Sequence, residues 1–422
     1  MIGQSVYAKN PQGITLEELK EILRNSISDC KENLKKVLLL VPDITRFHSC
    51  AGQIANIYYH ELCDTCQVDL LPTLGTHKPM TDEEIDEMYG DIPHDKFIVH
   101  DWRNDVVKIG EVPADFVTEV SEGTFCEKID VEVSRHLYDG YDLILSIGQV
   151  VPHEVVGMAN HSKNIFVGCG GSSMISSSHI LGAFYGLERM MGKDHSPVRK
   201  VFDYACNFLA DLPIHYVMTV NTAPGGVVNM HGIFIGAERK YFEDAVALSQ
   251  EKNITYLEKS VPKIVTYLDP KEFKSTWLGG KAIYRTRMAV SAGGEIGVLA
   301  PGIDVCGEDE ENDRVIRKYG YCGRENVIAL CKTEDDMKNN LSAAAHLIHG
   351  SSDGRFTITH CDKILTEEEV KALKFNYVHY DEAIKKYDPE KLQPGFNTLP
   401  DGEEIYYVPN PALGLWIAKD RI

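Results

Sequence analysis

The chain has 422 residues, of which 43% are hydrophobic and 25% charged. This length suits two domains better than one, and the composition argues against intrinsic disorder. The formal net charge of −20 argues against nucleic-acid binding and against docking on anionic lipid, both of which need a basic face. A local cluster of Arg and Lys can still hold an anionic substrate.

The sequence predicts a cytoplasmic protein with no membrane partner. It has no run of about 18 apolar residues, and its first residues, MIGQSVYAKNPQG, lack an apolar signal core. The eleven cysteines follow no framework spacing, which fits free thiols in a reducing compartment. Cys63 and Cys66 form a C-x-x-C without a second pair, so we interpret them as small residues at a helix end rather than a zinc or redox site.

The first half of the chain alternates helical and strand-like patterns. Thr15 is a plausible N-cap, followed by acidic residues in the first turn, and KVLLLVP is the apolar run of a strand buried on both faces. This alternation predicts a mostly parallel sheet with helices on both faces. The helical patterns cover residues 15–29, 50–61, 80–90 and 197–210. The strand patterns cover residues 36–42, 67–73, 97–101, 142–148 and 215–221.

A second unit is predicted to begin after about residue 262. We therefore expect an α/β fold of two domains, residues 1–262 and 263–422. Each would be a mostly parallel or mixed sheet flanked by helices, with the active site in the cleft between them. The patterns in the second domain are strands near 263–268, 296–300 and 375–379 and a helix at 333–348.

Polar side chains follow the predicted strands of the first domain, where parallel sheets bind ligands. Asp43 and Arg46 lie in VPDITR, and the fixed fork of Arg46 suits a carboxylate or phosphate, although a loop salt bridge is the alternative. His77 lies in LGTHKP just before a helix, where a neutral imidazole is favoured. His153 follows the strand DLILSIG.

Lys163 lies ten residues after His153, and His179 lies sixteen residues after Lys163. A histidine and a lysine close together after a strand suggest either a base with a covalent amine or a metal site. Between them and the helix of His179 lies GCGGSS. The backbone N–H groups of Gly170 and Gly171 are candidates for a phosphate cradle, with a simple tight turn as the alternative.

Together, VPDITR, GTHKPMTDEE and PHEVVGMANHSK followed by His179 resemble the lactate racemase family. These are 2-hydroxyacid racemases and epimerases that depend on a nickel-pincer cofactor, and the resemblance covers the first 200 residues. It implies nickel held by an organic pincer derived from a pyridinium mononucleotide and covalently tethered through a thioamide. By match of motif, Lys163 is the tether and His179 is the protein ligand of nickel. The glycine turn would then accept the cofactor phosphate.

The same resemblance implies that His77 and His153 are the acid/base groups on the two sides of the substrate's C2. Arg46 would hold or polarise the substrate, and Asp43 would belong to the same pocket. The implied enzyme is an isomerase, which inverts C2 by proton-coupled hydride transfer to the pincer through a 2-keto acid. Return from the opposite face needs a second base, so two histidines are expected.

The sequence departs from the family pattern in three places. One lies shortly after the tether, where the lactate enzymes have Pro-Gly and this chain has Val167 and Gly168. The lactate enzymes have a glycine-rich stretch before the tether, where this chain has Ala159, Asn160 and His161. In lactate racemases the stretch that corresponds to KAIYRTRMAV supplies a glutamine and a lysine to the substrate pocket, and this chain has other residues at both positions.

At those pocket positions this chain has Tyr284 followed by Arg285, and Met288 stands where the lysine would be. We interpret Tyr284 and Arg285 as substrate-binding residues. Arg285 and Arg287 would suit a more oxygenated acid, so a sugar acid such as D-gluconate is preferred over lactate; surface charge on a helix is the alternative.

Two other functions are weighed against this one. A metal-free Schiff-base lyase or aldolase would use Lys163 alone, and a non-catalytic hydroxy-acid binding protein would need none of the acid/base chemistry. The expected partners are a small-molecule 2-hydroxy acid and cofactor-biosynthesis proteins, with no nucleic acid and no membrane. The sequence leaves an oligomer open.

Overall fold

The computed structural model describes residues 1–421, which form two compact units. The first unit comprises Met1–Ser178 and Met190–Asn253. The second comprises His179–Arg189 and the chain from Ile254 onward. The sequence-based division after residue 262 differs in two respects, because the second unit begins earlier and also takes in the segment that carries His179.

The first unit is built on a six-stranded sheet in the order β1-β10-β9-β6-β2-β3. Strands β3, β2, β6 and β9 are parallel, whereas β10 and β1 add an antiparallel edge. This confirms the mostly parallel α/β sheet. Two hairpins, β4 with β5 and β7 with β8, stand outside it. The strands are β1 (Gln4–Tyr7), β2 (Lys36–Val41), β3 (Gln67–Pro72), β4 (Val106–Val112), β5 (Ile129–Ser134), β6 (Leu143–Gln149), β7 (Pro152–His153), β8 (Gly157–Met158), β9 (Ile214–Thr222) and β10 (Asn229–Gly236).

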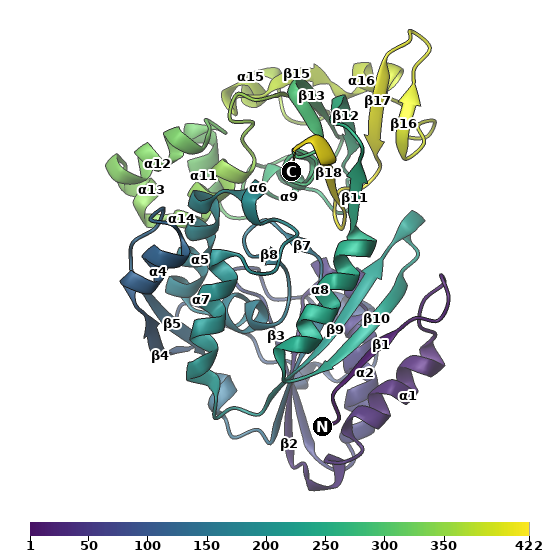
Figure 1. Ribbon diagram of the computed structural model, residues 1–422, viewed down its shortest axis with the longest axis vertical. Helices are drawn as coiled ribbons and strands as arrows, with labels where there is room; N and C mark the ends of the chain where they lie inside the picture. The colour runs from purple at the N-terminus through teal and green to yellow at the C-terminus, as the bar shows by residue number, and fades with distance from the viewer. Residues whose placement is uncertain (422) are drawn as a thin grey trace. The chain divides into compact units, whose positions relative to one another are not determined.

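Helices cover both faces of this sheet (Figure 1). Alternate strand residues such as Leu39 and Ile233 pack in one core with α1 and α2. On the other face, Gly232 lies against Leu248 of α8. Thr15 caps α1 in a capping box with Glu18, as its position predicts. The helices are α1 (Leu16–Ile27), α2 (Ala51–Leu62), α3 (Asp82–Tyr89), α4 (Ala114–Val120), α7 (Pro197–Ala205) and α8 (Arg239–Asn253), and α5 (Ser172–Tyr185) crosses the break between the units.

The second unit has its own six-stranded sheet, in the order β15-β14-β13-β12-β17-β16, parallel except for β16. A separate parallel pair joins β11 and β18. The strands are β11 (Ile254–Leu257), β12 (Val261–Tyr267), β13 (Val290–Ala300), β14 (Thr357–Asp362), β15 (Asn376–His379), β16 (Gly395–Thr398), β17 (Glu404–Val408) and β18 (Leu415–Ala418). The helices are α6 (Leu187–Met190), α9 (Thr276–Gly279), α10 (Lys281–Tyr284), α11 (Glu310–Tyr319), α12 (Arg324–Thr333), α13 (Asp335–Asn339), α14 (Leu341–His349), α15 (Glu367–Ala372) and α16 (Tyr380–Lys386).

Two predicted elements are wrong in detail. The strand expected at 97–101 is absent, because this segment meets the sheet only through a bridge between Phe97 and Leu70. The helix expected at 333–348 is interrupted at Asn340, whose side chain accepts the Ala343 N–H at 3.0 Å and starts α14 anew. Among residues 1–421, no helix combines the length and apolar character needed to cross a bilayer.

Candidate active site

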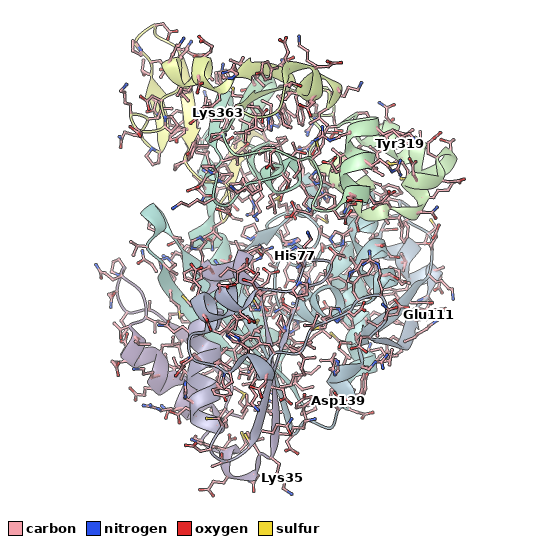
Figure 2. All side chains as sticks on the ribbon, turned by 180° about the vertical axis from the view of Figure 1, so that it is seen from behind. Lys35, His77, Glu111, Asp139, Tyr319 and Lys363 are labelled. Atoms are coloured by element: carbon pink, nitrogen blue, oxygen red, sulfur yellow. The ribbon has the colours of Figure 1, made fainter. Side chains whose placement is uncertain are left out.

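Asp43 and His77 form a hydrogen-bonded pair at the carboxyl ends of β2 and β3. Asp43 begins the 3₁₀ turn Ile44–Ser49, where its Oδ1 accepts the Thr45 N–H at 3.0 Å. Its Oδ2 lies 2.5 Å from His77 Nδ1. The Asp43 side chain is 7% exposed, whereas that of His77, labelled in Figure 2, is 45% exposed. The carboxylate is thus held inside the protein while the imidazole reaches outward.

The pair keeps Asp43 ionised and sets the tautomer of the neutral His77 ring. Burial opposes ionisation of Asp43, but the hydrogen bond from His77 and the charges of His77 and Arg46 hold its pKa well below the usual value. An ionised carboxylate only accepts hydrogen bonds, so Nδ1 of His77 must carry a proton. In the neutral ring, the lone pair is then on Nε2, which is the arrangement of a base oriented by a carboxylate.

The His77 loop is joined to the segment that follows Lys163. The Gly75 N–H donates to the Gly168 carbonyl at 2.8 Å, and the His77 N–H donates to the Leu74 carbonyl at 2.9 Å. Gly75 has a φ of +57°, a left-handed backbone that favours glycine. Gly168 closes the π-helix Asn164–Gly168, which begins directly after Lys163. The topology therefore brings together two predicted site segments that are far apart in sequence.

His153 is held in the opposite tautomer. It lies on the hairpin β7–β8 and is 8% exposed. Its Nδ1 accepts the Val155 N–H at 3.1 Å, so the neutral ring carries its proton on Nε2. The Glu154 carboxylate lies 3.8 Å from the same Nδ1 and provides a counter-charge when the ring is protonated. His77 and His153 are therefore prepared differently, the first with a lone pair and the second with an N–H on Nε2.

Lys163 is half-buried and shares the electrostatic environment of these groups. Burial, with Arg46 and Arg199 adding positive charge, lowers the pKa of Lys163 to about 8, against the opposing charges of Glu154 and Asp43. A substantial fraction of the amine is therefore neutral near physiological pH and nucleophilic. Arg46 is half-buried, and both of its hydrogen bonds, to Thr45, are long ones from Nη1, at 3.3 and 3.4 Å.

The glycine turn corrects one prediction. The Gly170 N–H donates to the Val167 carbonyl at 3.3 Å, and the Gly171 N–H donates to the Glu132 carbonyl at 3.1 Å. A Cβ on Gly171 would lie 2.4 Å from the Glu132 carboxylate, which also accepts the Ser173 N–H at the start of α5. These N–H groups are engaged and a carboxylate occupies the helix end, so Gly170 and Gly171 do not form the expected phosphate cradle. They permit close packing instead.

The remaining predicted residues belong to the second unit. His179 is half-buried on α5. Tyr284 ends α10 and is buried, with its ring 6.4 Å from that of His349. Arg285 is also buried, and its Nη1 donates to the Gly414 carbonyl at 3.0 Å. Both side chains are buried, so the alternative interpretation of Arg285 as surface charge on a helix is wrong.

Arg287 is a structural residue. Its guanidinium donates to Glu188 at 2.7 Å, to Asp353 at 2.9 Å and to the carbonyls of His349 and Ser351 at 3.2 and 3.0 Å. It is buried, so the alternative of a solvated surface charge is wrong. With its fork engaged by protein acceptors, it is also not the substrate ligand that the sequence suggested.

Comparison with known proteins identifies a match over the part of the chain that contains most of the candidate site residues. Residues 7–190, which include Asp43, His77, Lys163 and His179, match the sequence model of the lactate racemase N-terminal domain. This part of the chain belongs to the lactate racemase family. The resemblance predicted from the motifs is confirmed. No functionally curated protein sequence matches the chain.

Two solved structures share the fold. A protein from Thermotoga maritima is 24% identical, with a TM-score of 0.81 over 96% of this chain and 98% of its own. The lactate racemase apoprotein from Thermoanaerobacterium thermosaccharolyticum is 16% identical, with a TM-score of 0.71 over 98% and 100% of the two chains. At these identities the likeness establishes the α/β fold, which agrees with the predicted class.

The departure from the lactate racemase pattern before Lys163 has a structural meaning. Asn160 and His161 have φ values of 72° and 56°, in the left-handed region that glycine enters without cost. Glycine would adopt these φ values without strain, so the glycine-rich stretch that the resemblance implies is compatible with the backbone that Asn160 and His161 adopt here. Sequence reasoning singled out neither Glu154 nor Arg199. Glu154 lies in the quoted motif beside His153, whereas Arg199 lies outside the motifs and reaches the Lys163 loop from α7.

Proposed function

We propose that this protein is an isomerase that inverts C2 of a 2-hydroxy acid and that it works with a nickel-pincer nucleotide tethered to Lys163. Family membership supports the racemase or epimerase class. The observation that carries the proposal is the difference between the two histidines. His77 presents a lone pair beside a buried carboxylate, whereas His153 presents an N–H beside Glu154.

The residues present fit the cofactor that the family implies. The amine of Lys163 is half-buried, nucleophilic and close enough to Arg46 for their charges to interact, and Arg46 offers a guanidinium to a carboxylate. No group of three or more His, Cys, Asp and Glu within residues 1–421 is arranged to hold a metal ion. A nickel site therefore needs donors from the cofactor, with His179 as the proposed protein ligand.

When bound, the nickel-pincer nucleotide would supply a group able to accept and donate the hydride of C2, with Lys163 and His179 as the residues that would hold it. The protein moves the proton. For one enantiomer, Nε2 of His77 accepts the C2 hydroxyl proton, and Asp43 stabilises the resulting imidazolium. Loss of this proton together with the hydride leaves a 2-keto acid.

His153 completes the inversion from its charged form. In that form Nδ1 also carries a proton and faces the Glu154 carboxylate, because the Val155 N–H can donate only to the neutral ring. Nε2–H donates its proton to the oxygen as the C2–H bond reforms, which leaves a neutral ring with its remaining proton on Nδ1. In the reverse direction the two histidines exchange roles, and both recover their resting protonation by exchange with solvent.

We propose a sugar acid such as D-gluconate as substrate rather than lactate. Support comes from the replaced pocket residues: Tyr284 brings a phenol and Arg285 a guanidinium to positions where the family resemblance implies a glutamine and its neighbour. Each adds hydrogen-bond donors that suit a polyhydroxylated chain.

The test is to produce the protein together with nickel-pincer biosynthesis proteins. Intact-mass spectrometry should then show a mononucleotide-sized adduct on Lys163, with bound nickel, and the Lys163→Ala variant should show neither. A panel containing lactate, malate and gluconate should reveal a change of C2 configuration for one member. A protein with neither adduct nor nickel would overturn the proposal.

A second candidate is a metal-free Schiff-base lyase, which the lowered pKa of Lys163 favours. It predicts that borohydride traps substrate on Lys163 in protein made without the biosynthesis proteins. The third alternative, a hydroxy-acid binding protein, predicts that His77→Ala and His153→Ala retain ligand affinity and that no inversion occurs.

A further inference from the structure

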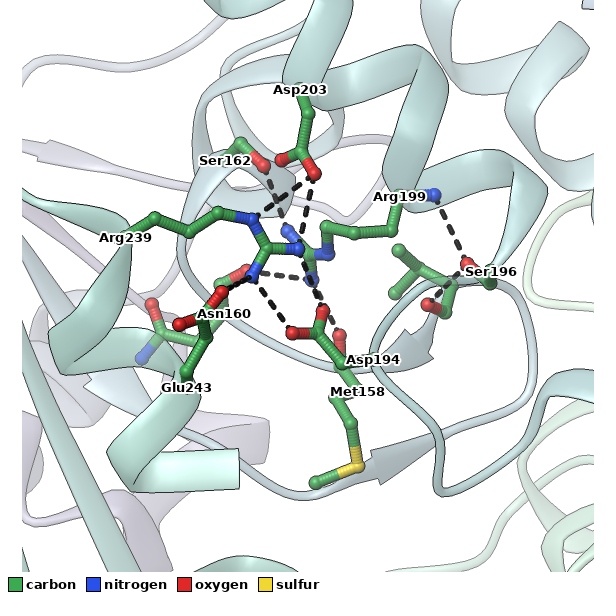
Figure 3. A network of polar contacts seen from close by, with 10 residues as sticks. Met158, Asn160, Ser162, Asp194, Ser196, Arg199, Asp203, Arg239 and Glu243 are labelled. Carbon is green, nitrogen blue, oxygen red and sulfur yellow. Dashed lines mark hydrogen bonds and ion pairs between the residues drawn. The ribbon is translucent and has the colours of Figure 1, made fainter. Parts of the chain in front are cut away.

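A buried arginine outside the motifs holds the loop that leads to Lys163. Arg199 lies on α7 and is 0% exposed. Its Nη1 donates to Ser162 Oγ at 2.7 Å, and its Nη2 donates to the carbonyls of Met158 and Asn160 at 2.6 and 3.2 Å (Figure 3). All three acceptors belong to the five residues that precede Lys163. A buried guanidinium is costly to desolvate, so these contacts must compensate it.

The loop itself cannot hold this shape through backbone preference alone. Asn160 and His161 are consecutive non-glycine residues with left-handed φ values, which persist only when the surroundings fix them. Asn160 Oδ1 accepts the His161 N–H at 2.6 Å and Asn164 Nδ2 at 2.9 Å. The His161 ring stacks between Tyr216, with centroids 4.0 Å apart, and a phenylalanine of α8.

A second layer fixes the position of Arg199. Ser196 Oγ accepts the Arg199 N–H at 3.0 Å and donates to the Val156 carbonyl at 2.8 Å, which ties α7 to the hairpin of His153. Arg239 bridges Asp194, at 2.8 and 2.9 Å, and Asp203, at 3.1 and 3.2 Å (Figure 3). The network thus connects α7 and α8 to the hairpin and the loop that carry two proposed site residues.

We propose that Arg199 is a positioning residue for Lys163, which fixes the Met158–Ser162 loop and thereby the location and surroundings of the Lys163 amine. The inference rests on the proposed role of Lys163 as the tether. A guanidinium is required because its planar fork meets a hydroxyl and two carbonyls at once, whereas an ammonium is a single point charge. Arg199 acts through the loop and is not assigned a contact with substrate or cofactor.

The experiment measures the reactivity of Lys163 in protein that lacks the cofactor. Amines are acylated with an N-hydroxysuccinimide ester of acetate at a series of pH values, and peptide mass spectrometry gives the midpoint of Lys163, with exposed lysines as internal references. The charged groups that act on Lys163 are Arg46, Glu154, Arg199 and Asp43, and its pKa of about 8 sets the wild-type midpoint.

In Arg199→Lys the positive charge remains but the fork is lost. The loop should loosen, water should reach the amine, and the midpoint should rise by about one pH unit or more toward the ordinary lysine value. Ser162→Ala removes one of the three contacts and should shift the midpoint in the same direction by less. The matched control is Lys200→Met, the next residue of α7, which is exposed and should leave the midpoint unchanged.

Unchanged midpoints in folded Arg199→Lys and Ser162→Ala would overturn the inference, and Ser162→Ala carries the test alone if the arginine variant does not fold. This result is separable from the proposed function. An absent adduct in the wild-type protein overturns the tether role whatever the midpoints, whereas an unchanged midpoint overturns the role of Arg199 even when the adduct forms.

Discussion

Replacing Asp43 with asparagine tests the central claim about His77. The substitution preserves shape but removes the charge that accepts the Nδ1–H at 2.5 Å. An asparagine amide can donate to Nδ1 as readily as its oxygen can accept from it. If it donates, the ring proton moves to Nε2, and the lone pair that accepts the substrate proton is lost.

The magnitude follows from the two effects of this change. A hydrogen bond to a charged group contributes about 1.5–3 kcal/mol, and each 1.36 kcal/mol is tenfold in rate. Loss of the charge alone therefore lowers kcat about tenfold to a hundredfold. A wrong tautomer costs more, up to about ten-thousandfold where a carboxylate orients a catalytic histidine. We expect Asp43→Asn to lie between these limits.

The assay is the rate of C2 inversion by loaded enzyme, measured from both epimers, with adduct mass and nickel content confirming equal loading. Asp142→Asn is the matched control, because Asp142 accepts the N–H groups of Lys35 and Lys36 at 2.8 and 2.9 Å before β6, far along the strands from the site. In a His77→Gln background, Asp43→Asn should add little, since one group acts through the other. Wild-type rates in equally loaded Asp43→Asn would refute the pairing.

Three further predictions follow from other contacts. His153→Gln should slow inversion about a hundredfold to ten-thousandfold with unchanged adduct mass, whereas retained inversion would remove His153 from the mechanism. Arg287→Met should lower the free energy of unfolding by about 3 kcal/mol, since it removes the guanidinium that pairs with Asp353 and leaves Glu188 with Arg355 alone; a changed KM with unchanged denaturant midpoint would contradict its structural role. The folded-state pKa of Asp43 is lowered, so its stabilisation is complete above the unfolded value of about 3.9 and is lost as pH falls below it. Denaturation between about pH 3 and 7 should therefore show a smaller pH dependence for Asp43→Asn than for the wild type, and equal slopes would contradict this linkage.

The central strands could be predicted because their environment leaves a clear pattern. A strand covered on both faces by helices, such as Lys36–Val41, is a continuous apolar run. The antiparallel strand β10, next to the edge strand β1, mixes glycine and polar residues, and β16–β18 have only four or five residues each, so no pattern marks them. The segment 97–101 shows the opposite failure, since its apolar run forms one bridge, between Phe97 and Leu70, and no ladder, and leaves Val99 exposed.

Each candidate site residue could be selected singly from the sequence, but the contacts between them could not be predicted. Asp43 and His77 are 34 residues apart, and Arg199 and Ser162 are 37 apart, so only the topology brings them together. The prediction of a phosphate cradle at Gly170 and Gly171 is wrong for a related reason. A sequence shows that glycine exposes its N–H, but not that Val167 and Glu132 already accept it.

The unusual residues before Lys163 and the buried arginine belong to one structural solution. Glycine at the positions of Asn160 and His161 would adopt their left-handed φ without strain. This chain instead places side chains there, which lock the loop through the Asn164 contact and the Tyr216 stack but also incur backbone strain. Arg199 supplies the external bonds that such a loop needs. A relative with glycine at the positions of Asn160 and His161 does not need an arginine at the position of Arg199. Among chains of this fold, non-glycine residues at these two loop positions should therefore occur together with the buried arginine.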